Sequence, residues 1–236
     1  MAIMKTTTAA AAALSLSVVL AGCTPNEQAS TTPGTTPSVW TGSPAPAHEG
    51  AHGEGFEEPA QGSNLHQYIL DNKIAEVPFQ SGDPGTPKID FPLPPDWSPA
   101  GDRTPDWAYG AIVYDKAQDP ANPPFMYAIA SKLTGAVDPE KILQLAPGQL
   151  NELPGFKPVE GPPQRDKLSG FDSVNYVGTY EWEGETRSVG QETIVIPGKD
   201  ALFVLQLNGE APGGQEQVVI DAAKVIRAQT KIALPS

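Results

Sequence analysis

The sequence predicts an α+β domain in which a mostly antiparallel β-sheet is flanked by helices. Long runs of alternating apolar and polar residues, which are typical of strands, follow one another along the chain and are separated by short turns. Helical patterns stand before, between and after these runs, and their order differs from the regular strand and helix alternation of a parallel α/β fold.

The first 22 residues have the features of a cleavable export signal. Lys5 gives a weakly positive start, and an apolar run covers 9–20. That run is shorter than the ~20 residues a membrane-spanning helix needs, which disfavours an uncleaved anchor. The sequence LAGC at 20–23 resembles a lipobox, in which small residues admit the peptidase and the cysteine takes up lipid. We expect a lipoprotein signal at 1–22 and acylation of Cys23, for example by palmitate; a plain secretory signal is the alternative.

Residues 23–63 are expected to form the lipidated cysteine and a disordered linker. The segment is rich in Thr, Pro, Ser, Ala and Gly, and it cannot bury enough apolar surface to offset the entropy of ordering it. Two histidines and four glutamates at 48–58 could collect a metal ion. Because a disordered segment must also be organised around the ion, an acidic linker is the favoured interpretation and no metal site is predicted.

One globular domain is expected over 64–236, because this length buries a sizeable core without disulfides or metals. A short helix should start it, with Leu65, Tyr68, Ile69 and Asn72 at helical spacing. A proline-rich connection follows, in which 88–93 can form an edge strand. Two strands at 109–114 and 125–133 should pair antiparallel, because the proline-rich loop between them reverses the chain.

The second half of the domain predicts a helix, a strand meander and a final helix. Asp138 is a good N-cap and Pro139 a good first helical residue, and Pro147 should break this helix. The meander comprises strands at 174–182, 186–196 and 201–207. The last strand is apolar on both faces and should be central and covered on both sides. The apolar stripe of the final helix, which should pack on the sheet, is formed by Val219, Ala222, Ala223, Ile226 and Thr230.

The composition and the missing motifs exclude several classes of function. The formal net charge of −13 disfavours nucleic acid, which needs clustered Lys and Arg. All three histidines lie at or before residue 66, so a Ser or Cys nucleophile in the sheet lacks a base. No phosphate loop, dinucleotide motif or serine nucleophile elbow is present. Glu181, Glu183 and Glu185 could form an acid and base pair, but their spacing is also that of a solvent-exposed strand face, which we favour. We expect no enzyme and no cofactor.

Aromatic side chains are the candidate ligand-binding residues. Tyr and Trp rings combine apolar area with a hydrogen-bonding group, which suits a groove for a sugar or an acyl chain. In the strand at 174–182 the aromatic residues alternate with polar ones and should share one face. The candidates are Trp107, Tyr109, Tyr127, Tyr176, Tyr180 and Trp182. For each ring, a place in the core is the competing interpretation.

Short motifs spread over the domain resemble the mycobacterial LpqN-type lipoproteins. They are GDPG at 82–85, YGAIVY at 109–114, SKLTG at 131–135, LPGF at 153–156, VIP at 195–197, FVLQLN at 203–208 and DAA at 221–223. The resemblance extends from about Asn64 to Ile232 and includes the lipobox and the linker. It implies a PsbP-like αβα sandwich, a fold shared with Mog-type Ran-binding proteins. The stretches 98–107 and 159–167 depart most from the family pattern.

The resemblance also implies a function. Members are described as non-enzymatic lipoproteins on the extracytoplasmic face of the cell membrane, which bind trehalose mycolates or similar acyl sugars. They assist MmpL-type lipid exporters in mycomembrane biogenesis, and some are discussed as secreted proteins that meet host factors. No short catalytic motif accompanies the family, so only the lipidated Cys23 carries over to this chain. A protein-interaction module that binds a transporter or a host protein without a lipid ligand is the alternative.

Overall fold

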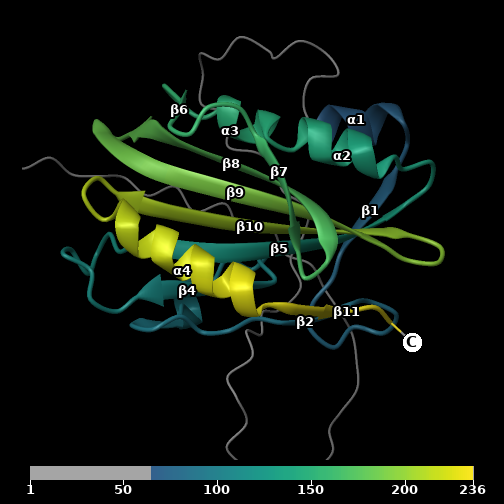
Figure 1. Cartoon of the computed structure of the whole chain (residues 1–236), viewed down its shortest axis with the longest axis horizontal. Helices are drawn as coiled ribbons and strands as arrows, with labels where there is room; N and C mark the ends of the chain where they lie inside the picture. Colours follow the sequence, from purple (N-terminus) through teal and green to yellow (C-terminus); the bar gives the residue numbers. More distant parts are fainter. Residues whose placement is uncertain (1–64, 236) are drawn as a thin grey trace, which may run out of the picture. The chain divides into compact units, whose positions relative to one another are not determined.

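The computed structural model describes residues 65–235, so the expected signal at 1–22 and linker at 23–63 lie outside the described residues. Within the described range, helices and strands alternate irregularly (Figure 1). In chain order they are α1 (Leu65–Asp71), β1 (Ala75–Pro78), β2 (Lys88–Asp90), β3 (Trp97–Pro99), β4 (Gly110–Tyr114), β5 (Phe125–Thr134), α2 (Pro139–Leu145), α3 (Gly148–Asn151), β6 (Lys157–Pro158), β7 (Gln164–Leu168), β8 (Phe171–Trp182), β9 (Glu185–Pro197), β10 (Leu202–Pro212), α4 (Glu216–Gln229) and β11 (Lys231–Ala233).

Nine strands form one antiparallel sheet. Their order is β3-β4-β5-β10-β9-β8-β6, with β1 added beside β5 and β7 added beside β8. Every strand pair within residues 65–235 is antiparallel. The small β2–β11 pair stands apart from this sheet. The predicted α+β class with a mostly antiparallel sheet is therefore confirmed.

Helices cover both faces of the sheet, as Figure 1 shows. On one face α1 and α2 close a core cluster that contains Leu65, Ile142 and Val204. On the other face α4 closes a second cluster, which contains Leu205, Leu207 and Ile226. Consecutive residues of β10 thus belong to different clusters, because strand side chains alternate between faces. The layers are helix, sheet and helix.

The strand β10 lies between β5 and β9, and residues 202–209 are all buried. The prediction of a central strand covered on both faces is confirmed. The strand runs five residues beyond the predicted end at 207, through Asn208, Gly209 and Glu210. These residue types disfavour strands on their own, but here both neighbours hold them in register, with Asn208 opposite Gln191 and Tyr127.

The capping signals place the middle helices correctly. The Asp138 side chain accepts a hydrogen bond of 2.9 Å from the backbone N–H of Glu140, and Pro139 opens α2. The helix ends before Pro147, and the single turn of α3 follows it. The predicted first helix and the predicted pairing of 109–114 with 125–133 are also confirmed.

Five strands are not foreseen by the sequence pattern: β1, β3, β6, β7 and β11. Four of them have two to four residues, too few for a periodic pattern to show. The fifth, β7, has four exposed residues of five, and its polar sequence QRDKL looks like a loop. Backbone pairing with β8, rather than burial of side chains, therefore defines this strand.

Candidate functional site

An apolar cleft lies between α4 and the sheet. Its volume is about 190 Å³, and its lining comes from β5, β8, β9, β10, α4 and the segment after β6. The helix α4 is amphipathic, and its apolar residues contact both the core and the cleft. Ala222 and Ile226 are buried on the core, and Ile226 also borders the cleft. Val219, Ile220 and Ala223 line the cleft and remain partly accessible. The helix thus forms the roof without filling the space beneath it.

Two paired glycines, Gly190 and Gly209, lie on the sheet surface that forms the floor of the cleft. One cross-strand row runs from Met126 on β5 through Gly209 on β10 and Gly190 on β9 to Val177 on β8. A Cβ on Gly190 would meet only the Val177 side chain, at 3.2 Å, so space is left open above this glycine. A Cβ on Gly209 would lie only 2.8 Å from the Val219 side chain, so α4 packs directly on the sheet there.

An ion pair between the half-buried Arg227 and the buried Glu192 lines the cleft beside the C-terminal half of α4. Arg227 Nη1 lies 2.6 Å from Glu192 Oε2, and the Arg227 guanidinium also pairs with Asp166. Ser173 Oγ donates a 2.8 Å hydrogen bond to Glu192 Oε1. Burial raises the pKa of the Glu192 carboxyl, and the neighbouring Arg227 charge opposes this rise.

The lips of the cleft are apolar and its charges are mainly negative. Val159, after β6, and Ile220, on α4, are 66% and 44% exposed and both line the opening. Glu160, Glu192 and Glu216 line the cleft together with one cation, Arg227. An amphiphile with an apolar tail and an uncharged head suits this lining better than an anion does.

The six predicted aromatic residues do not line this cleft. Tyr109 is 1% exposed and packs in the core against the rings of Phe79 and Phe91, at centroid distances of 5.9 and 6.2 Å. It is therefore inaccessible to a ligand. Trp182 is 55% exposed at the end of β8, beside the tight turn to β9. Tyr109 thus occupies the core position that was the competing interpretation, and a ligand role for Trp182 stays a prediction.

The other four rings gather on the face opposite the cleft. In the ladder Tyr176 stands opposite Gln191, and Tyr180 opposite Arg187. Tyr127 belongs to the same face through its pairing with Asn208, and the rings of Trp107 and Tyr127 meet edge to face at 5.2 Å. Burial raises the pKa of the Tyr127 hydroxyl to about 12, and the nearby Glu210 charge adds to this. A ligand role for these four rings stays a prediction.

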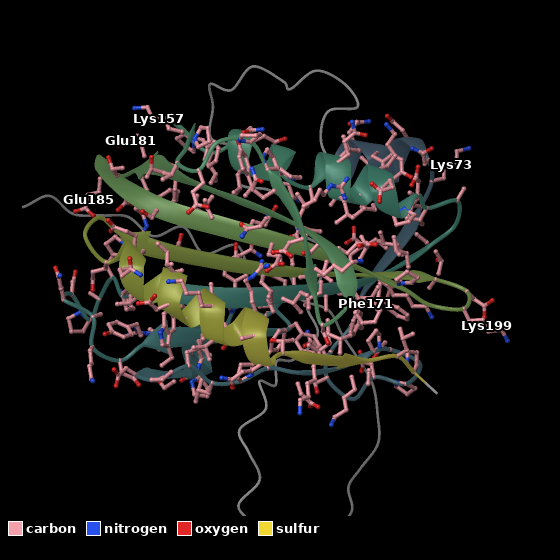
Figure 2. All side chains as sticks on the ribbon, in the orientation of Figure 1. Lys73, Lys157, Phe171, Glu181, Glu185 and Lys199 are labelled. Atoms are coloured by element: carbon pink, nitrogen blue, oxygen red, sulfur yellow. The ribbon has the colours of Figure 1, made fainter. Side chains whose placement is uncertain are left out.

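The Glu181, Glu183 and Glu185 carboxylates sit on the exposed β8–β9 hairpin, and Figure 2 shows Glu181 and Glu185 at this end of the domain. Glu183 occupies the turn with a φ of 51°, followed by Gly184 with a φ of 83°. Within residues 65–235, no three His, Cys, Asp or Glu side chains gather as a metal site. In the same range, no helix is long and apolar enough to cross a membrane.

Sequence reasoning missed the cleft, although one signal was available. Gly190 and Gly209 interrupt long strand patterns, and glycine inside a strand marks a close approach or an open space. The pattern cannot say that the two glycines are neighbours, because that depends on the register between β9 and β10. The apolar stripe of α4 predicts a helix face that packs on the sheet, and it does not indicate that Val219 and Ala223 also line a cleft.

Comparison with known proteins places the chain in a family. The family model described as "Probable lipoprotein LpqN" matches residues 61–233. The lipoprotein LpqN of Mycobacterium tuberculosis (strain ATCC 25618 / H37Rv) is 44% identical over 231 residues, covering 97% of this chain and 99% of that protein. A crystal structure of LpqN, described as involved in cell envelope biogenesis of Mycobacterium tuberculosis, superimposes with a TM-score of 0.68 at 46% identity, covering 72% of this chain and 97% of that one.

The Saccharomyces cerevisiae Ran-binding protein Mog1p is a distant structural match. It gives a TM-score of 0.38 at 15% identity and covers 66% of this chain and 94% of that one, which is too remote to support an argument. The family assignment rests instead on the family model and on the high identity along almost the whole chain. The fold, the family model and the sequence relative agree, and the chain belongs to the LpqN lipoprotein family.

Proposed function

We propose that this chain is a lipid-anchored, non-enzymatic accessory protein of the cell envelope that binds an acylated sugar, with the acyl chain in the cleft beneath α4. The apolar cleft is the observation that carries the proposal. The LpqN relative is described as involved in cell envelope biogenesis, which agrees with such a role. A trehalose mycolate type of ligand and assistance to an MmpL-type exporter are the finer form of the proposal.

The shape of the cleft suits an alkyl chain. Its floor is a row of apolar side chains and glycines, and its roof is the apolar side of α4. Moving each methylene group from water into such a site contributes about 0.8 kcal/mol. Binding needs no large rearrangement of the sheet, because the space is already present between packed elements.

The charge at the cleft favours a neutral head group. The cation Arg227 is already paired with Glu192 and Asp166, so no free positive charge awaits a carboxylate or a phosphate. Glu160 and Glu216 add repulsion for an anionic head. A sugar offers hydroxyl groups that hydrogen-bond to such carboxylates without bringing charge.

Filling the cleft tests the proposal. We expect the chain from residue 23, carrying Cys23→Ser, to bind a dodecyl ester of trehalose in calorimetric titration below the micelle concentration. Gly190→Leu should weaken binding at least about tenfold, because the leucine occupies the acyl position. Its Cβ would meet only the Val177 Cγ1 methyl at 3.2 Å, so the fold should tolerate the change.

The matched control is Gln217→Leu, which adds the same side chain on the exposed side of α4, outside the cleft. It should bind like the parent. Equal binding by Gly190→Leu and by Gln217→Leu would refute the cleft as the acyl site. A transporter or host-protein partner stays a prediction, and crosslinking in native envelope is the measurement for it.

A further inference from the structure

Two large apolar side chains stand exposed on either side of the mouth of the cleft beneath α4. Val159 follows β6, and Ile220 lies on α4. Both side chains line the cleft and are also exposed to solvent, so they carry its apolar lining out to the surface of the domain. These two residues are named the lips of the cleft. Exposed apolar groups gathered at one opening are typical of a surface that meets a second apolar body.

The sheet and the helix hold the lips in place. The Val159 backbone N–H donates a 3.2 Å hydrogen bond to the Val177 carbonyl, which holds the segment after β6 against β8. Ile220 is positioned by α4, whose residues Ala222 and Ile226 are buried against the sheet. Each lip is thus carried by backbone that is fixed to the sheet, and contact with a partner needs no rearrangement of the domain.

The charges beside the lips are mainly negative. Glu160 follows Val159, and Glu216 precedes Ile220 by about one helical turn; both carboxylates line the cleft. The exposed Lys157 lies outside the lining, at the end of the domain that Figure 2 labels. The one cation in the lining is already paired with carboxylates. An anionic lipid surface would be repelled here, whereas an uncharged one covers the lips without this cost.

The small area of the lips favours lipid over protein as the partner. A specific protein interface buries about 800 Å² on each side, which is far more than two side chains supply. A second copy of the chain would also bring the same carboxylates and a net charge of −13 to the contact. A lipid surface requires no matching shape, because its acyl chains adapt to whatever apolar group enters.

The length of chain before α1 allows the lips to reach the membrane that would hold an acylated Cys23. Residues 24–64 separate Cys23 from Leu65, where α1 begins, and a segment of this length spans at most about 140 Å. A domain of this size has a radius of gyration of only about 16 Å. Tethering also raises the local concentration of lipid around the domain, so that a weak contact made by two side chains is sufficient.

We propose that the lips dock on an uncharged lipid surface, with Val159 and Ile220 entering its outer apolar layer and the cleft opening toward the lipid. The inference rests on the proposed function in one respect, since the docked cleft receives an acyl chain. That chain then passes from the lipid layer into the cleft without crossing water. Docking itself needs only the lips, so it is tested separately from acyl binding.

Photolabelling from vesicles tests the docking. The single cysteine of the chain from residue 23 is coupled to a maleimide lipid in phosphatidylcholine vesicles, in which some phosphatidylcholine carries a diazirine near the head of its acyl chain. After irradiation, mass spectrometry of peptides should find label at Val159 and at Ile220. Replacing half of the phosphatidylcholine by phosphatidylglycerol should lower this label at least about threefold, because the carboxylates beside the lips are repelled.

A charge on one lip should prevent docking of both. Val159→Glu should lower the label at Ile220, and Ile220→Glu the label at Val159, each at least about fivefold, because a carboxylate does not enter the apolar layer. The matched control is Val77→Glu on β1, where the parent side chain is 58% exposed, lies outside the cleft and is far from β6 in Figure 1. It should be labelled like the parent. Thermal unfolding verifies that all three variants are folded.

The cleft-filling variant separates docking from acyl binding. Gly190→Leu should no longer bind the trehalose ester but should be labelled at both lips like the parent, because the lips are unchanged. Loss of the label in this variant would overturn the docking proposal, since the label would then come from acyl chains taken into the cleft. A parent that is labelled at both lips but does not bind the ester would instead refute the proposed acyl site and leave docking supported.

Three other results would overturn the docking proposal. The first is a parent in which the lips carry no more label than Leu70, which is 57% exposed on α1 and lies outside the cleft. The second is equal labelling of the lips from phosphatidylglycerol-rich vesicles. The third is an untethered chain that sediments as a dimer and is dissociated by Ile220→Glu, because a second copy would then cover the lips.

Discussion

At the scale of single residues, Glu192 brings a carboxylate to the lining of the cleft beneath α4. Its side chain is 7% exposed and receives hydrogen-bonding contacts from Ser173 and Arg227. Burial still raises its pKa, so the folded protein holds the carboxyl proton more tightly than the unfolded chain does. The ion pair with Arg227 therefore only partly offsets the cost of removing the charge from water.

The raised pKa predicts how stability changes with pH. A carboxyl whose pKa is higher in the folded state contributes stability that is full below the unfolded pKa and is lost as pH rises through the folded pKa. In Glu192→Gln this loss is absent. Urea unfolding should therefore show the parent losing stability relative to Glu192→Gln as pH rises above about 4.5, the ordinary pKa of a glutamate. A parent that gains on the variant over this range would contradict the assignment.

At the scale of elements, the distance between α4 and the sheet determines whether the cleft exists. Gly209 is where helix and strand meet, because a Cβ there would lie 2.8 Å from Val219 Cγ1. The Met126 side chain would lie 3.4 Å from the same Cβ, so an added methyl group has little free space beside Val219. A methyl group at this point must displace the helix or its side chains.

Gly209→Ala should destabilise the domain by about 1–3 kcal/mol because it overpacks this contact. Denaturant unfolding measures the loss. Adding Val219→Ala removes the clashing methyl groups, so the double variant should recover part of the stability lost by Gly209→Ala. Strictly additive losses in the two single variants and the double variant would show that the contact does not limit the approach of α4.

Elements differ in how far their sequence predicts them. The helix α2 follows from Asp138 and Pro139, and the pairing of β4 with β5 follows from two strand patterns around a proline-rich loop, since these signals are local. The polar strand β7 and the final residues of β10 depend on partners distant in the chain. No local propensity indicates such pairing, so the sequence does not reveal it.

At the scale of the whole molecule, the sheet separates the cleft beneath α4 from the face that carries Tyr176 and Tyr180. The aromatic alternation in β8 correctly places Tyr176 and Tyr180 on one face, because the strand period is local. The sequence could not show that α4 leaves a cleft on the other face, since this depends on the register that aligns Gly190 with Gly209. Tyr109 lies in the core, and the sequence could not show this, because a strand period indicates the face of a residue and not how deeply it is buried.

Attachment to the membrane is a prediction for the full chain. We expect a labelled fatty acid to be incorporated into the protein in its own cell, and Cys23→Ala to abolish the label and to shift the protein from the membrane to the soluble fraction. One acyl chain binds membranes only weakly, so a diacylated cysteine is needed for stable anchoring. Unchanged membrane partitioning of Cys23→Ala would refute lipidation as the anchor.

Mapping the position of the bound acyl chain tests whether the cleft beneath α4 is the acyl site. A trehalose ester whose alkyl chain ends in a photoactivatable diazirine is bound to the protein, irradiated and mapped by mass spectrometry of the peptides. We expect labels on Val219, Ala223 and Met126, which line the cleft beneath α4. Labels concentrated instead on Tyr176, Tyr180 or Phe125, on the opposite face of the sheet, would contradict it.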